Sequence, residues 1–111
     1  MDIDISVNGD SFSINVENPH RFNVLDRMED IVDFGNKVGI NLSPYALDTL
    51  IPLMIRGVAG CEAGCPSDAM GVARRGFGDF KIDYIEGGIL TATQKLENGN
   101  LLDVKIFPDF K

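Results

Sequence analysis

The chain has 111 residues, of which 44% are hydrophobic and 24% charged, a balance typical of one folded globular domain over residues 1–111. Its formal net charge of −7 argues against binding to nucleic acid or to an anionic membrane, because both require a basic surface. No stretch approaches the roughly 20 apolar residues of a membrane helix. Because Met1–Asp4 also lacks the basic start and the apolar run of a signal peptide, we expect a cytoplasmic protein.

The beginning of the chain predicts a β-hairpin. Apolar and polar residues alternate over 2–8 and again over 11–17, and Asn8-Gly9 lies between the two runs. Asn-Gly between alternating runs is a strong signal for a two-residue hairpin turn. We therefore predict two paired strands, each with one buried face.

Residues 18–60 predict two amphipathic helices. The first is expected over 20–38, with Asn18 as its cap and apolar residues at helical spacing. The second is expected over 43–60, where a stripe of apolar residues again marks the buried face. Pro52 should kink this second helix, because proline cannot donate the backbone hydrogen bond of a helix interior.

A third, short helix is predicted after the second. Pro66 suits the first helical position, Cys65 would be the cap, and Asp68 suits the positive end of the helix dipole. The helix should end at Arg74 and Arg75, because cations are favourable at the negative end of the dipole.

The end of the chain changes to a period of two and predicts three more strands. Alternating runs lie at 80–85, 90–96 and 102–107, with Gly87-Gly88 as a turn between the first two. The order β-β-α-α-α-β-β-β groups strands with strands and helices with helices, which indicates an α+β fold. We expect an antiparallel sheet of about five strands, with the helices packed on one face.

Both cysteines of the chain, Cys61 and Cys65, lie between its second and third predicted helices. Two cysteines in a cytoplasmic chain are more often reduced, metal-bound or redox-active than joined in a structural disulfide. This stretch is therefore the first candidate for a functional site.

Residues 61–70 read CEAGCPSDAM, which resembles the closing part of the bacterial iron–sulfur ferredoxin motif. Cys61 takes the position of the third cysteine of that motif, and Cys65 with Pro66 takes that of the fourth. The two upstream cysteines of the motif are absent from this chain. The resemblance therefore implies an iron–sulfur cluster only if a second chain supplies the missing ligands, as in a symmetric homodimer.

A redox dithiol is an alternative interpretation of the same two residues. Cys65 at the beginning of a helix would meet unpaired backbone N–H groups and the positive end of the dipole, which favour a thiolate. Cys65 would then be the nucleophile of a thiol–disulfide oxidoreductase, and Cys61 would resolve the mixed disulfide.

Two further interpretations of the cysteine stretch remain open. A zinc site on Cys61 and Cys65 would need two more ligands, and the only histidine, His20, is far upstream. Asp or Glu residues could complete such a site, although their spacing does not indicate it, or the zinc could be shared with a second chain. The cysteines can also be purely structural, with Gly57 and Gly60 allowing two helices to meet closely.

A second candidate surface follows the third helix. Arg74 and Arg75, next to Phe77, could bind a carboxylate, a phosphate or the acidic surface of a partner. An aromatic residue near the end of the chain, Phe110, would favour association of two copies if exposed. We therefore expect a protein partner, or a second copy of the chain, as the ligand.

These patterns together predict a small cytoplasmic accessory or binding protein associated with redox or electron-transfer metabolism. The helix corner at Cys61 and Cys65 would be its functional surface. The alternatives are the thiol–disulfide oxidoreductase described above and an interaction subunit without chemistry of its own.

Overall fold

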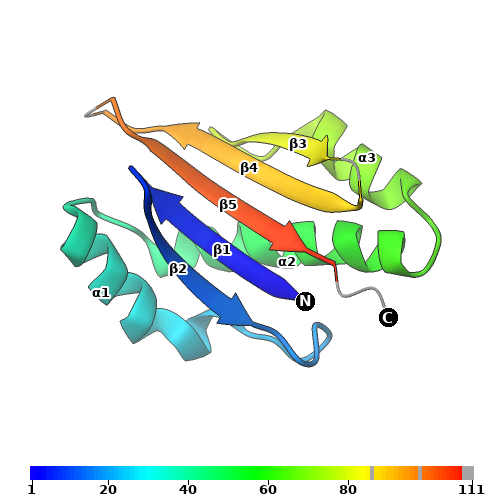
Figure 1. Ribbon diagram of the computed structural model, residues 1–111, viewed down its shortest axis with the longest axis horizontal. Coiled ribbons are helices and arrows are strands. Elements are labelled where there is room, and N and C mark those ends of the chain that lie inside the picture. Colours follow the sequence, from blue (N-terminus) through cyan, green and yellow to red (C-terminus); the bar gives the residue numbers. More distant parts are fainter. Residues whose placement is uncertain (86, 98, 109–111) are drawn as a thin grey trace.

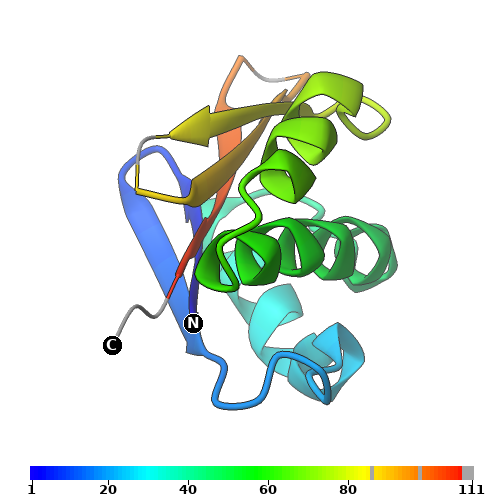
Figure 2. The ribbon, with the colours of Figure 1, turned by 90° about the vertical axis from the view of Figure 1, so that its right-hand side faces the viewer.

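The computed structural model describes residues 1–85, 87–97 and 99–108. In this part of the chain, five antiparallel strands form one sheet in the order β2-β1-β5-β4-β3, and three α-helices lie together on one face of it (Figures 1 and 2). The fold is therefore α+β, with strands and helices in the order that the sequence predicts. No helix in the described part of the chain is long and apolar enough to cross a membrane.

The sheet joins the two ends of the chain. Its strands are β1 (Asp2–Val7), β2 (Asp10–Asn15), β3 (Lys81–Ile85), β4 (Ile89–Lys95) and β5 (Leu101–Phe107). The first and last strands are neighbours, because β1 pairs with β5 in antiparallel register, with Ile5 opposite Val104. The hairpin between β1 and β2 turns at Asn8 and Gly9, whose φ angles of 53° and 85° are those of a type I′ turn.

Alternate residues of every strand face the helices and form the core. In β1, Ile3 and Ile5 are fully buried, whereas their neighbours Asp2 and Asp4 point to the opposite face of the sheet. The core is closed by the apolar faces of the helices. Its largest fully buried side chains are Ile3, Ile5, Ile14, Ile31, Leu47, Leu50, Ile51, Met54, Leu90 and Ile106.

The first helix begins later than the sequence predicts. A short 3-10 helix, η1 (Val24–Arg27), leads into α1 (Met28–Val38), so the prediction of a helix from His20 is wrong. The Asn18 side chain accepts a hydrogen bond from the backbone N–H of His20 at 3.2 Å, which stabilises a local turn instead of a helix cap. Asn23 is the residue that caps η1, because its side chain accepts from the N–H of Leu25 at 3.0 Å.

The second helix, α2 (Pro44–Glu62), lies across the centre of the covered face (Figure 2). It begins as predicted, with the Ser43 hydroxyl accepting from the N–H of Ala46 at 3.3 Å. The apolar stripe predicted for it is buried, but the helix runs past Gly60 to Glu62. It also runs through Pro52, which is exposed on the solvent side, where a helix tolerates the loss of one backbone hydrogen bond.

Two glycines of α2 allow the third helix, α3 (Ser67–Arg75), to approach closely. A Cβ atom on Gly57 would lie 2.9 Å from Leu90 Cδ1 and 3.1 Å from the Cα of Ala69. A Cβ atom on Gly60 would lie 2.6 Å from a carboxylate oxygen of Asp68. Cβ atoms almost never lie within 3.0 Å of another heavy atom, so the distances of 2.9 and 2.6 Å show that these glycines set the separation of α2 and α3.

A glycine of α2 and a glycine of α3 should respond to alanine in opposite directions. We expect Gly57→Ala to lower the free energy of unfolding by about 1–3 kcal/mol, because the added methyl group overlaps Leu90 and Ala69. We expect Gly71→Ala in α3 to raise it by up to about 1 kcal/mol, because the part of the chain that the structure describes has no atom within 4 Å of the new Cβ and alanine favours the helix. Urea unfolding of both variants measures the difference, and destabilisation of equal size at the two positions would contradict the packing described here.

Candidate functional site

The corner between α2 and α3 is fixed by backbone hydrogen bonds. The N–H of Gly64 donates to the carbonyl of Cys61 at 3.0 Å, and the N–H of Cys65 donates to the carbonyl of Gly60 at 2.7 Å. This pair of bonds, with Gly64 at φ 84°, is a Schellman motif. The motif satisfies the last carbonyl groups of α2 and fixes the backbone of Cys65 beside the end of that helix.

The beginning of α3 lies one residue later than predicted. The helix begins at Ser67, and the residue flanking it is Pro66, so Cys65 is not its cap. Pro66 already has helical backbone angles, φ −63° and ψ −14°, and it has no side-chain group that could accept a capping bond. Cys65 contributes through its backbone, because its carbonyl accepts from the N–H of Asp68 at 3.2 Å.

The two thiols differ in their surroundings. Cys65 lies within a run of seven exposed residues, 62–68, whereas Cys61 is half-buried and packs against the core. Both cysteines are free thiols. The corner therefore exposes the Cys65 thiol to solvent, whereas the Cys61 thiol is half-buried.

Four influences act on the Cys61 thiol. Its pKa is raised above the ordinary value, first by burial and then by the negative charges of Asp68 and Glu62. A hydrogen bond with the side chain of Tyr84 acts in the opposite direction and lowers the pKa. The net effect on the pKa is upward, so the surroundings of Cys61 favour its neutral thiol over its thiolate.

Tyr84 is the residue of the site that sequence reasoning did not identify. It lies on β3 and faces the helices, opposite Leu90 of β4. The alternating pattern of β3 indicates that this position faces inward, but only the three-dimensional packing brings it to Cys61. The thiol corner is thus connected to the edge of the sheet.

The described residues of one chain do not complete a metal site. Among them, no group of three or more His, Cys, Asp or Glu side chains could hold a metal ion. His20 lines a different hollow, against Pro52 and Ile55 in the middle of α2. A metal or an iron–sulfur cluster on Cys61 and Cys65 would therefore need ligands from a second chain.

The three residues predicted to form a second surface, Arg74, Arg75 and Phe77, have different surroundings in the structure. Arg74 and Arg75 are exposed in the last turn of α3, but Phe77 is half-buried and packs against the core. Phe77 also exchanges two backbone hydrogen bonds with Phe80, at 3.2 and 2.8 Å, across a tight turn. Phe110, which was expected to favour association, lies outside the described residues.

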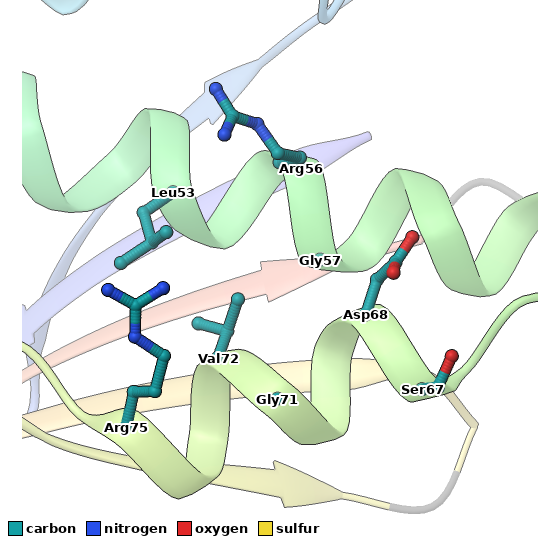
Figure 3. Close-up of a pocket in the computed structure, with 8 residues that line it drawn as sticks. All are labelled: Leu53, Arg56, Gly57, Ser67, Asp68, Gly71, Val72 and Arg75. Carbon is teal, nitrogen blue, oxygen red and sulfur yellow. The ribbon is translucent and has the colours of Figure 1, made fainter.

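A groove runs along the contact between α2 and α3, with a volume of about 310 Å³ (Figure 3). Arg75 lies on its α3 side and Arg56 on its α2 rim. Sequence reasoning did not identify Arg56, because the groove arises from the pairing of two helices and leaves no motif in either one.

Comparisons with known proteins add nothing to this geometry. No family model matches the chain, and neither a curated protein nor a solved structure matches it.

The protonation of Cys61 can be tested through its alkylation rate as a function of pH. In a Cys65→Ser background, we expect Asp68→Asn to lower the pH at which Cys61 becomes reactive, because a negative charge that opposes the thiolate is removed. We expect Tyr84→Phe to raise that pH, because the hydrogen bond that lowers the pKa is lost. Mass spectrometry after timed exposure to iodoacetamide gives the profiles.

The control for this experiment is Asp33→Asn, which removes an exposed carboxylate of α1. It should leave the profile of Cys61 unchanged. Shifts of the same sign for Asp68→Asn and Tyr84→Phe would show that the two side chains do not act on the thiol as described.

Proposed function

We propose that this chain is a small cytoplasmic accessory protein of redox or electron-transfer metabolism, which binds a protein partner through the corner at residues 61–68. Cys65 is the thiol presented to the partner, and Cys61 is the thiol behind it. The link to redox metabolism rests on the resemblance of residues 61–70 to the closing part of the ferredoxin motif. A cytoplasmic location agrees with two free thiols, because the reducing cytoplasm keeps cysteines unpaired.

The exposure of Cys65 is the observation that carries the proposal. Cysteine is among the most buried residue types, and a cysteine that acts only as a small hydrophobe belongs in a core. Cys65 instead lies in the longest exposed run of the described residues, 62–68. A connection that is held rigidly by its backbone and projects a reactive side chain is a common type of binding surface.

A second candidate, a thiol–disulfide oxidoreductase, is favoured by the difference between the two thiols. An exposed thiol can attack a disulfide of another protein, and a protected second thiol can resolve the mixed product. Cys65 and Cys61 have these two degrees of exposure. Cys65 would be the nucleophile and Cys61 the resolving residue.

Thiol–disulfide exchange through Cys65 and Cys61 takes two steps. The Cys65 thiolate attacks a disulfide of the partner, which forms a mixed disulfide and releases one partner thiolate. Cys61 then loses its proton to water and attacks the Cys65 sulfur, which forms the Cys61–Cys65 disulfide and releases the second partner thiolate. Two electrons pass from this chain to the partner. The raised pKa of Cys61, caused by burial and by Asp68 and Glu62, slows the second step.

A metal or iron–sulfur site fits these residues less well than free thiols do. Within the described part of one chain, the two cysteines do not belong to any group of three or more His, Cys, Asp or Glu side chains that could hold a metal ion. Cys61 would also have to give up its proton against nearby negative charge, and its hydrogen bond with Tyr84 would change. Such a site would need a homodimer that brings four thiols together.

Site-directed cross-linking in the producing cells tests the binding surface. We expect a photoreactive residue at Ala63, in the exposed corner, to capture a defined protein, whereas the same residue at Asn36, exposed on α1, should not. Mass spectrometry identifies the captured protein. Capture of the same proteins from both positions would contradict the proposal that the corner is the binding surface.

Cysteine variants in the same experiment separate the two candidates. If the chain is an oxidoreductase, Cys61→Ser should accumulate a mixed disulfide with the captured protein through Cys65, because the resolving thiol is absent. Cys65→Ser should form no such product. If the chain is an accessory protein without thiol exchange, neither variant should form a mixed disulfide, and both should retain the cross-link from Ala63.

A further inference from the structure

The groove between α2 and α3 has charges of opposite sign at its two ends. Arg75 lies at one end and extends toward Leu53 of α2, and Asp68 lies at the other end (Figure 3). Seven positions separate Asp68 from Arg75 on α3, which corresponds to about 10 Å along a helix. The lining residues are Leu53, Arg56 and Gly57 of α2, with Ser67, Asp68, Gly71, Val72 and Arg75 of α3.

The arginines of the groove are not used to hold the fold together. In the described part of the chain, the side chains of Arg56 and Arg75 make no hydrogen bond and no ion pair. Arg27 is different, because its side chain pairs with Asp30 at 2.8 Å. The Arg75 side chain extends into the space between the two helices, whereas that of Arg56 projects from α2 away from α3 (Figure 3). In a chain of net charge −7, the guanidinium group of Arg75 leaves a local site for an acidic group.

Gly71 is the second observation that points to a ligand. Glycine weakens a helix interior relative to alanine, so it normally has a packing reason there. Gly57 has such a reason, because a Cβ atom would overlap Leu90 and Ala69. Gly71 has none, because no atom of the described residues lies within 4 Å of a Cβ added to it. Because Gly71 has no side chain, it leaves the groove open on the α3 side.

We propose that this groove binds a short extended segment of a partner protein, with an acidic residue against Arg75 and a basic residue against Asp68. An apolar residue between them lies over Gly71 and Val72. In the extended polyproline II conformation a chain has three residues per turn and rises about 3.1 Å per residue. Residues three positions apart then lie on the same face about 9 Å apart, so the acidic and basic residues stand three positions apart.

A peptide fits the groove better than a compact anion does. The Asp68 carboxylate repels an anion at one end of the groove, and a small oxyanion at Arg75 would leave the apolar lining of Leu53 and Val72 uncovered. A chain with both signs of charge satisfies both ends at once. Neither Cys61 nor Cys65 lines the groove, so this inference goes beyond the proposed function and can hold if the thiols are inert.

The test uses NMR titration of the complete ¹⁵N-labelled chain with the acetylated, amidated tetrapeptide Glu-Leu-Ala-Lys. We expect saturable shifts confined to the amides and arginine side chains of the groove, and none with the neutral tetrapeptide Gln-Leu-Ala-Gln. Arg75→Glu should weaken binding by about tenfold or more, because attraction becomes repulsion. Arg74→Glu is the matched control, since it makes the same charge change one residue away and outside the groove, and it should change the affinity by less than about twofold.

A groove-filling variant provides independent evidence. Gly71→Leu should abolish the shifts without unfolding the chain, because space for its Cβ is already open, and a thermal melt checks the fold. The proposal is overturned if the Glu-Leu-Ala-Lys peptide gives no saturable shifts, or if Gly71→Leu binds as the unaltered chain does. An equal loss of peptide affinity in Arg74→Glu and Arg75→Glu would show that the peptide is attracted by the overall charge of this surface and not by a defined site, and this result would also overturn the proposal. If inorganic phosphate or glutarate binds the same residues more tightly than the peptide does, the groove is an anion site and the proposal is overturned.

Discussion

The close contact between α2 and α3 is the constraint on which the site depends. Gly57 and Gly60 let α3 lie directly against α2, which is itself held on the sheet by its buried apolar stripe. The chain can return so tightly only through a sharp turn, and the Schellman motif at Gly64 provides it. The exposed thiol of Cys65 and the groove beside Arg75 are both products of this contact.

Much of the fold could be predicted because its signals are local. The Asn8-Gly9 turn and the two alternating runs beside it define the first hairpin, and the apolar stripe of α2 is buried as its spacing indicates. The beginning of α1 was predicted wrongly, because Asn18 can stabilise a turn as readily as a helix. The pairing of β1 with β5 could not be predicted from the sequence, because it joins segments from the two ends of the chain.

The site was predictable only in part, because local signals in the sequence do not show which distant residues pack together. The thiols are conspicuous in the sequence, and their position at a helix corner follows from the glycines around them. Tyr84 and Arg56 belong to other elements, so only packing brings them to Cys61 and to the groove. Adjacent residues of a helix point in different directions, so Arg75 lines the groove and Arg74 does not. A run of adjacent arginines cannot reveal that difference.

The central claim is that the corner carries two free thiols, of which Cys65 is the accessible one. The most direct measurement is an iron and zinc analysis of the chain purified without oxygen, with a thiol titration of the same sample. The account predicts two titratable thiols per chain, the first reacting much faster than the second, and no stoichiometric metal. Iron or zinc in fixed ratio to the chain, with both thiols protected until the metal is removed, would contradict it.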